Sequence, residues 1–363
     1  EYFSSFFEID NLIGILPIAL WIIMSAGFFA AAVLAIKRGA IALISVTLAL
    51  SIVSVALFPK AVTGNWFIEK ALDATGESSD ISVYEPFKEG NSNAVLDEES
   101  TLRMLEDFPV LDGALALYPV YAAVASAVYE ECEEAKNAVT FTNTLRAYKG
   151  LADGDSDVVF ATAPSDSQRD YARKRGVNYV LTPIGKEAFV FLVGKDNPID
   201  DLTYKQIRDI YSGKTAKWRT LGWSEGGSII AYQRPDGSGS QVGLESIMKD
   251  LPIASPRPLS EELVGTNSLM KQVSVVYRGV QPALGYSFRF FAGEMYPNDN
   301  AKMLKVNGVS PTAENISSGK YPFVITFYAV TAGEPRGNAA KLIEWLISPQ
   351  GQDLIEKCGY AKL

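Results

Sequence analysis

Two long uncharged runs limit the folds that are open to this chain of 363 residues. Residues 11–36 carry no charge, and after Lys37 and Arg38 a second uncharged run covers residues 39–59. Each run is long enough to cross a hydrocarbon core of about 30 Å as a helix, which takes about 20 residues. A buried core hairpin would show polar stripes, which are missing here. The sequence therefore predicts two transmembrane helices that form a hairpin over residues 1–60.

The charges around these runs predict their orientation. Lys37 and Arg38 lie in the connection between the runs, whereas Glu1, Glu8 and Asp10 lie before the first run. Because short cytoplasmic loops carry an excess of positive charge, the connection is expected in the cytoplasm. The chain is thus expected in the cell membrane as a multi-pass protein, with everything after residue 60 extracytoplasmic.

An acidic segment follows the hairpin. Residues 71–107 contain ten acidic side chains against two basic ones, Lys88 and Arg103, with glycine, serine and asparagine between them. This composition is typical of a solvated linker or of a loosely docked arm. We therefore assign residues 61–110 to an acidic linker or docked arm.

Beyond residue 110, short apolar runs alternate with helical patterns. The expected strands are rich in β-branched and aromatic residues and cover residues 157–162, 188–193, 228–233, 283–288 and 323–330. The expected helices cover residues 119–131, 145–152, 167–175, 203–211, 241–249 and 338–347. Such alternation predicts α/β layers with parallel strand pairing, and ligands at the ends of strands against helix N-termini.

Composition excludes several kinds of chemistry. The chain has no histidine, which removes Ser-His-Asp and Cys-His catalysis and histidine-ligated zinc. Its two cysteines, Cys132 and Cys358, form either one long-range disulfide or two buried thiols. A net charge of -9 argues against nucleic acid as a partner. We expect no enzyme activity and no cofactor.

The segment QRPDGSGSQ, residues 233–241, is the strongest local candidate for a binding site. It does not fit the nucleophile elbow G-x-S-x-G or the kinase loop G-x-G-x-x-G. Its glycines let the backbone close around a ligand, and the helix that follows favours negative charge at its start. A Gly/Ser turn that only caps a helix remains the alternative. The anion cradle would consist of Arg234, Asp236, Gly237, Ser238, Gly239 and Ser240.

Five stretches in a characteristic order resemble the phosphate-binding proteins of ABC importers, which are of the two-lobed periplasmic-binding-protein type. The resemblance covers about residues 111–363, and it implies a Venus-flytrap of two α/β lobes that close over a dehydrated oxyanion. Lobe 1 is expected at residues 111–190 and 285–363, and lobe 2 at residues 191–284. The stretches are LTPIGKEAFVFLVGKDNP, LTYKQIRDIYSGKTAKW, QRPDGSGSQ, ALGYSF and LISPQGQDLIEKCGY.

The resemblance also implies roles for individual residues. Arg234 matches the family's ligand arginine and Asp236 its ion-pair partner, with donors from the start of the next helix and from a second helix that Thr144 is expected to cap. The family's first ligand turn appears here as GALALYP, which offers backbone donors only. The resemblance thus places Ser238, Gly239 and Ser240 in the anion site, and it adds the residues of this turn, which are Leu115, Ala116 and Leu117.

One departure from the family pattern concerns ligand choice. Thr162 stands where the family has a carboxylate that accepts the proton of hydrogen phosphate. A hydroxyl can both donate and accept, so it cannot reject a fully deprotonated anion. Ser165 or Arg289 could compensate.

These observations predict a membrane-tethered extracytoplasmic protein. It would bind inorganic phosphate or a similar oxyanion and deliver it to the permease subunits of an ABC importer. The alternative is a ligand-sensing receptor module, whose lobes close on an anion to signal to a membrane partner without transport.

Overall fold

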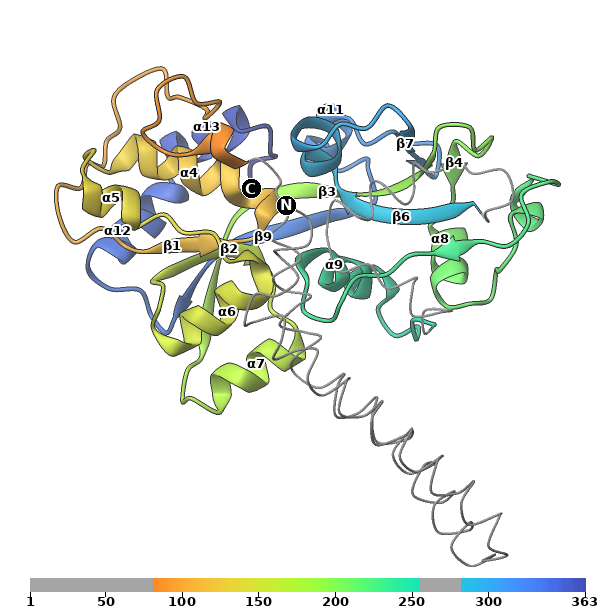
Figure 1. Ribbon diagram of the computed structural model, residues 1–363, viewed down its shortest axis with the longest axis horizontal. Helices are drawn as coiled ribbons and strands as arrows, with labels where there is room; N and C mark the ends of the chain where they lie inside the picture. The colour runs from red at the N-terminus through yellow and green to blue at the C-terminus, as the bar shows by residue number, and fades with distance from the viewer. Residues whose placement is uncertain (1–80, 255–281) are drawn as a thin grey trace, which may run out of the picture. The chain divides into compact units, whose positions relative to one another are not determined.

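The computed structural model describes residues 81–254 and 282–363, which belong to one compact unit, Thr75–Leu363 (Figure 1). The hairpin expected at residues 11–59 lies outside the described residues. Within the described ranges, no helix combines the length and the apolar character that a membrane crossing requires. These ranges form a mixed α/β fold.

One sheet contains seven of the described strands, in the order β1-β2-β9-β3-β6-β5, with β7 paired to β3. A separate pair consists of β4 and β8. The strands are β1 (Leu111–Gly113), β2 (Val158–Thr162), β3 (Tyr179–Gly194), β4 (Asp201–Leu202), β5 (Ile230–Ala231), β6 (Ala283–Phe288), β7 (Ala301–Met303), β8 (Lys305–Val306) and β9 (Val324–Ala332).

The expected parallel pairing is only partly present. β1 pairs with β2 in parallel, as β5 does with β6 and β4 with β8. β9, however, is antiparallel to both β2 and β3, and β6 and β7 are antiparallel to β3. The reason is the long strand β3, along which later segments of the chain return in the opposite direction.

All six expected helices are present, within a few residues of their predicted ends. They are α4 (Tyr118–Val128), α6 (Asn143–Asp153), α7 (Asp166–Arg173), α8 (Tyr204–Tyr211), α9 (Gly239–Met248) and α12 (Gly337–Leu346). Sequence patterns did not predict α5 (Glu133–Asn137), α11 (Ala313–Ser317) and α13 (Pro349–Lys357). α13 nevertheless has clear start signals, because Ser348 caps it and Pro349 occupies its first position.

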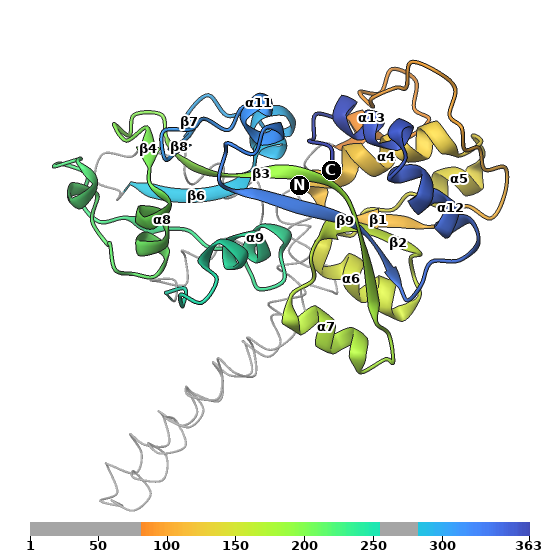
Figure 2. The ribbon, with the colours of Figure 1, turned by 180° about the vertical axis from the view of Figure 1, so that it is seen from behind.

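The strands β3 and β9 run from one group of elements to another (Figure 2), and each group has a large hydrophobic core of its own. Apart from Ala361, the buried members of one core lie between residues 188 and 323, and we call this part lobe 2. The other core draws its members from residues 104–184 and 327–360, and with a smaller cluster around Tyr148 it forms lobe 1.

The lobe boundary differs from the expected one. Residues 285–323 were expected in lobe 1, but Leu304, Val306 and Tyr321 lie in the core of lobe 2. Strand pairing explains the difference, because β6 and β7 both pair with the second half of β3. The chain therefore returns to lobe 1 only with β9.

The described part of the acidic segment, residues 81–110, is docked on lobe 1. Tyr84, Phe87 and Leu102 pack against its core, and Met104 is buried within it. The backbone N–H of Met104 donates to the carbonyl of Val128 at 2.8 Å. Acidic composition is compatible with docking here because the apolar side chains between the charges supply the contact.

The two cysteines do not form a disulfide in this structure. Cys358 is buried at the end of α13, and burial raises the pKa of its thiol to about 12. Cys132 caps α5 by accepting a hydrogen bond from the N–H of Ala135 at 3.4 Å.

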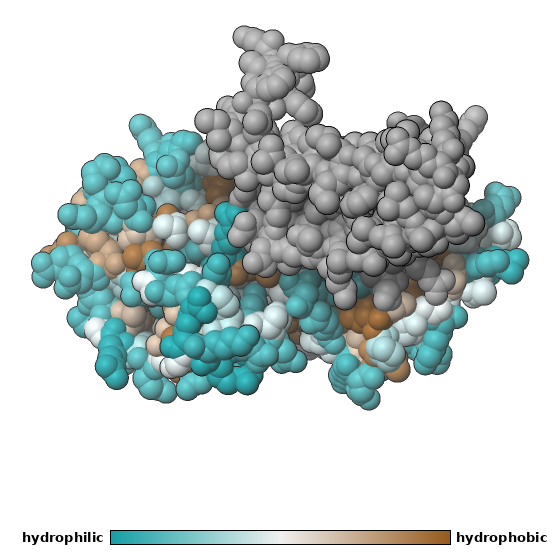
Figure 3. All heavy atoms as spheres, turned by 60° about the horizontal axis from the view of Figure 1, so that its bottom comes forward, coloured by the Kyte–Doolittle hydropathy of each residue, from teal (hydrophilic) through white to brown (hydrophobic). Residues whose placement is uncertain are grey.

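The surface drawn in Figure 3 is mostly hydrophilic where described residues form it, with hydrophobic residues in small groups. Single exposed apolar side chains are normal on folded proteins. This face therefore gives no reason to expect an extended apolar docking surface.

Candidate anion-binding site

The predicted cradle at residues 233–241 leads into helix α9. Ser238 is the N-cap of this helix, and its hydroxyl accepts a hydrogen bond from the N–H of Gln241 at 3.3 Å. Gly237 has φ +75°, which favours glycine. Gly239 and Ser240 begin the helix, where N–H groups have no intrahelical acceptor and the helix dipole favours an anion.

Arg234 places a buried cation in the segment that leads into α9. Its side chain is buried, with 7% of the residue exposed, and burial lowers its pKa to about 10. The guanidinium therefore stays charged at neutral pH. Its backbone N–H donates to Gln241 Oε1 at 3.1 Å and to the hydroxyl of Tyr286 at 2.9 Å, which fixes the turn to lobe 2.

Two threonine hydroxyls of lobe 1 converge on the first residue of α9. A Cβ atom added to Gly239 would lie 3.3 Å from Thr144 Oγ1 and 3.4 Å from Thr162 Oγ1. The Thr162 hydroxyl also points at the carbonyl of Gly239, at 3.5 Å. Thr162 ends β2 and is held there by Tyr148, whose hydroxyl donates to the Thr162 carbonyl at 2.5 Å. Hydroxyl donors from lobe 1 thus face the helix start of lobe 2.

The expectation that Thr144 caps a helix was wrong. α6 begins at Asn143, so Thr144 lies inside its first turn, and the residue in the N-cap position is Thr142. The helix begins earlier because Asn143 supports its first turn by accepting from the N–H of Leu145 at 3.1 Å. The hydroxyl of Thr144 is buried beside Gly239 all the same.

Ser165 lies at the rim of the site, where it caps α7. Its hydroxyl accepts from the N–H of Gln168 at 3.3 Å, and Gln168 Oε1 accepts from the N–H of Ser165 at 2.8 Å. This is a capping box. The Ser165 hydroxyl also lies 2.9 Å from that of Ser167, which in turn donates to Asp236 at 3.1 Å.

Sequence reasoning missed Ser167 and Gln168. The signal was present as the pattern S-x-x-Q at residues 165–168, but that pattern predicts only a helix start. The expected pairing of Asp236 with Arg234 remains a prediction, because the described partner of the Asp236 carboxylate is Ser167.

The expected ligand turn of lobe 1 is a single 3₁₀ turn, Leu115–Leu117, directly before α4. Leu117 N–H donates to the carbonyl of Ala114 at 2.9 Å, and the carbonyl of Ala116 accepts from the Tyr360 hydroxyl. Leu115 and Ala116 pack against the core of lobe 2. The turn therefore lies at the junction of the lobes, and its role in anion binding remains a prediction.

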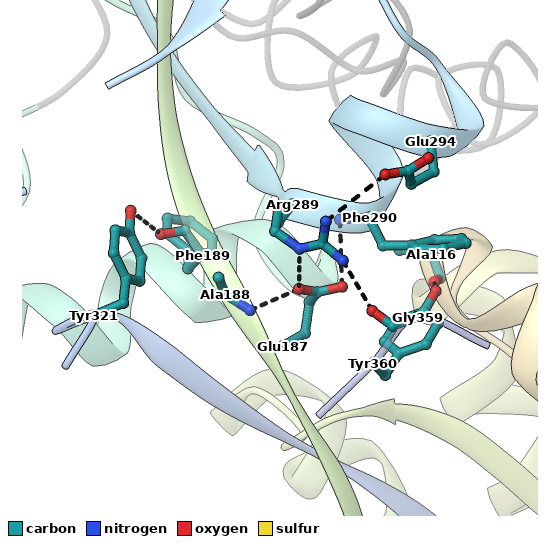
Figure 4. Close-up of polar contacts among 10 residues, drawn as sticks. All are labelled: Ala116, Glu187, Ala188, Phe189, Arg289, Phe290, Glu294, Tyr321, Gly359 and Tyr360. Carbon is teal, nitrogen blue, oxygen red and sulfur yellow. Dashed lines mark hydrogen bonds and ion pairs between the residues drawn. The ribbon is translucent and has the colours of Figure 1, made fainter. Parts of the chain in front are cut away.

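Arg289, the other residue considered for compensation at Thr162, makes different contacts (Figure 4). One of its terminal nitrogens donates to the carbonyl of Gly359 at 2.8 Å. Its guanidinium also lies 3.8 Å from Glu187 and 3.8 Å from Glu294. The described contacts of the Arg289 guanidinium are therefore with groups at the crossing of the lobes.

Two α/β lobes joined by long crossing strands, with a buried arginine in the segment before one helix and facing hydroxyls at the first residue of that helix, define a bilobed binding protein. A family model described as "PBP superfamily domain" matches residues 110–350. The chain belongs to the PBP superfamily.

Curated relatives are similar over most of the compact unit. The "Phosphate-binding protein PstS" of Bacillus subtilis is 23% identical over 268 residues, which cover 74% of this chain and 83% of the relative. "Protein SphX" of Synechococcus elongatus is 21% identical over 265 residues, which cover 69% of this chain and 76% of the relative.

Solved structures show the same fold. A putative phosphate ABC transporter substrate-binding protein from Clostridium perfringens, with bound phosphate, aligns with a TM-score of 0.51 at 24% identity. This alignment covers 70% of the present chain and 98% of the other. A DING protein aligns with a TM-score of 0.51 at 14% identity, covering 70% and 90%.

Proposed function

We propose that this chain binds a tetrahedral oxyanion between its lobes, with inorganic phosphate as the first candidate. It would do so as an extracytoplasmic substrate-binding protein that delivers the anion to the permease of an ABC importer. The observation that carries the proposal is a buried arginine, Arg234, in the segment that leads into α9, with the hydroxyls of Thr144 and Thr162 beside Gly239. The names of the relatives support phosphate.

The proposed site supplies what a dehydrated oxyanion needs. Arg234 offers a planar fork of donors, which matches two oxygens of one anion. The first turn of α9 offers backbone N–H groups and a favourable dipole, and the hydroxyls of Thr144 and Thr162 can donate to other oxygens. None of these groups is a nucleophile paired with a base, so we propose binding without catalysis.

Isothermal titration of the purified chain with phosphate, sulfate and a phosphorylated metabolite tests this function. We expect binding of inorganic phosphate and no turnover of the phosphorylated compound. Heat signals absent for all three anions would contradict the proposal. Binding of the metabolite alone would assign the site to a different ligand.

Thr162→Asp is expected to increase the preference for phosphate over sulfate about tenfold, or about 1.4 kcal/mol. A carboxylate in a dry site must meet a proton, and hydrogen phosphate carries one whereas sulfate at neutral pH does not. Paired titrations of both anions, on wild type and variant, measure the ratio.

Thr220→Asp provides a matched control for Thr162→Asp. Thr220 is an exposed threonine that donates to the carbonyl of Lys217 at 2.7 Å, so the same charge is added away from the proposed site. Its ratio should equal that of wild type. A Thr162→Asp ratio that also stays unchanged would show that another residue supplies the acceptor.

We further propose that residues 11–59 tether the protein to the membrane as a hairpin with Lys37 and Arg38 on the cytoplasmic side. A cysteine introduced by Gly39→Cys should then be protected from an impermeant thiol reagent in intact cells and react after permeabilisation. The background should carry Cys132→Ser, because Cys132 is a partly exposed free thiol and serine can still cap α5. Labelling from outside intact cells would reverse the proposed orientation.

A further inference from the structure

Two side chains at the start of α7 reach from lobe 1 to the anion segment of lobe 2. Ser167 Oγ donates to Asp236 Oδ2 at 3.1 Å. Gln168 Nε2 donates to the carbonyl of Gly237 at 3.0 Å. Both contacts join residues 69 positions apart in sequence, and both acceptors lie in the turn directly before α9.

Gln168 is fixed at both ends of its amide. Its oxygen closes the capping box with the N–H of Ser165, and its nitrogen faces the Gly237 carbonyl and, at 3.5 Å, the carbonyl of Thr144. Only 7% of the residue is exposed. A buried amide held in this way has little freedom, so it presents its N–H to lobe 2 without further ordering.

The acceptor side is equally constrained. A Cβ atom at Gly237 would lie 2.7 Å from Leu145 Cδ2 and 3.3 Å from Gln168 Nε2, so the two lobes are in close contact here. Gly237 is followed by Ser238 and Gly239, whose N–H and hydroxyl groups belong to the proposed anion site. Movement of the Gly237 carbonyl therefore moves the start of α9.

We infer that Gln168, assisted by Ser167, is a positioning residue that latches the lobes when they close over the anion. The inference rests on the proposed function. Because Ser167 and Gln168 lie in lobe 1 and residues 236–237 in lobe 2, separation of these two segments breaks the contacts, which therefore stabilise the closed arrangement selectively. Release of the anion requires the latch to open, and the latch should therefore act on the dissociation rate rather than on association.

Two substitutions test the latch in the purified full-length chain. Gln168→Glu keeps an oxygen for the N–H of Ser165 but places a second oxygen against the Gly237 carbonyl. Gln168→Met removes the donor without adding charge. We expect both variants to release labelled inorganic phosphate about tenfold faster or more, with an association rate within about twofold of wild type.

Gln206→Glu is the matched control. Gln206 closes the same type of capping box on α8, where its oxygen accepts from the N–H of Thr203 at 2.7 Å. This variant tests what a glutamate in a capping box does by itself, and its phosphate kinetics should equal those of wild type. Thermal unfolding without phosphate should show similar stability for Gln168→Glu and Gln206→Glu.

The outcomes separate the latch from the proposed function. Wild-type release rates in both Gln168 variants would overturn the latch while leaving phosphate binding intact. Faster release in Gln168→Glu alone would also overturn it, because the effect would then be charge repulsion of the anion.

If wild type binds no phosphate, the proposed function fails, and the latch is tested by trapping. The pair Ser167→Cys and Asp236→Cys, in a Cys132→Ser background, should form a disulfide on mild oxidation. A pair that stays reduced would show that the two segments do not meet, and would overturn the latch as well.

Discussion

Replacing Arg234 by alanine is expected to weaken phosphate binding by a hundredfold or more, which corresponds to about 3 kcal/mol. Hydrogen bonds to charged groups are each worth about 1.5–3 kcal/mol, and the guanidinium can make two to one anion. Because the side chain is buried, water can replace it only poorly. Isothermal titration with phosphate measures the loss. The affinity of Arg234→Lys should lie between those of wild type and Arg234→Ala, because lysine keeps the charge but not the planar fork of donors.

Arg208→Ala is the control for this prediction. Arg208 is a partly buried arginine of lobe 2 that donates to the carbonyl of Met248 at 2.7 Å. Its loss should lower stability while phosphate affinity stays near the wild-type value. Unchanged affinity in a folded Arg234→Ala protein would mean that residues 233–241 form a turn that only caps α9.

The sequence predicted those parts of the fold that local patterns specify. β6 has the predicted ends, since the short apolar run ALGYSF lies between Pro282 and Arg289. β3 is much longer than the predicted residues 188–193, because its first half contains Pro183, which argues against a central strand, and Gly185, which weakens one. A register shift between these two residues accommodates them. The lobe boundary was misplaced because it follows from pairing partners, which composition does not specify.

In the candidate site too, local sequence patterns predict some residues, whereas others depend on the tertiary structure. Arg234 and the start of α9 could be predicted because the charge, the glycines and the cap occur within eight residues of sequence. Gln168 could not, because its pattern predicts a helix cap and its second contact, with Gly237, depends on how the lobes meet. Local chemistry thus predicts one wall of the site, and the opposite wall requires the tertiary structure.

A buried carboxyl group, which the sequence analysis did not single out, lies at the crossing of the lobes. Glu187 lies on β3, between Ile184 in the core of lobe 1 and Ala188 in that of lobe 2. Its carboxylate accepts from the N–H of Ala188 at 2.7 Å and of Phe290 at 3.3 Å, and it faces Arg289 (Figure 4). Burial nevertheless outweighs these contacts and raises the pKa of Glu187 to about 7.

This raised pKa predicts a pH-dependent stability. The folded state binds the proton of Glu187 more tightly than the unfolded state, where glutamate titrates near 4.5. The stabilisation is therefore complete below about pH 4.5 and is lost as pH rises through about 7. A difference of about 2.5 units at 1.36 kcal/mol each amounts to about 3 kcal/mol.

Glu187→Gln removes this titration, because an amide stays neutral. The free energy of unfolding of the variant, minus that of wild type, should therefore increase by about 3 kcal/mol between pH 4.5 and pH 8, as measured by denaturant unfolding at each pH. Burial raises the pKa of the neighbouring Tyr360 hydroxyl well above this range, so that tyrosine does not contribute to the change.

Glu294→Gln separates the effect of burial from that of the arginine. Glu294 also lies 3.8 Å from Arg289, but 58% of its side chain is exposed. If burial at the crossing causes the pH dependence, the stability curves of Glu294→Gln and wild type should run parallel from pH 4.5 to pH 8, and only Glu187→Gln should diverge. Parallel curves for Glu187→Gln would show that the charged carboxylate is fully compensated by Arg289 and the two N–H groups, and that the crossing carries its charge without cost.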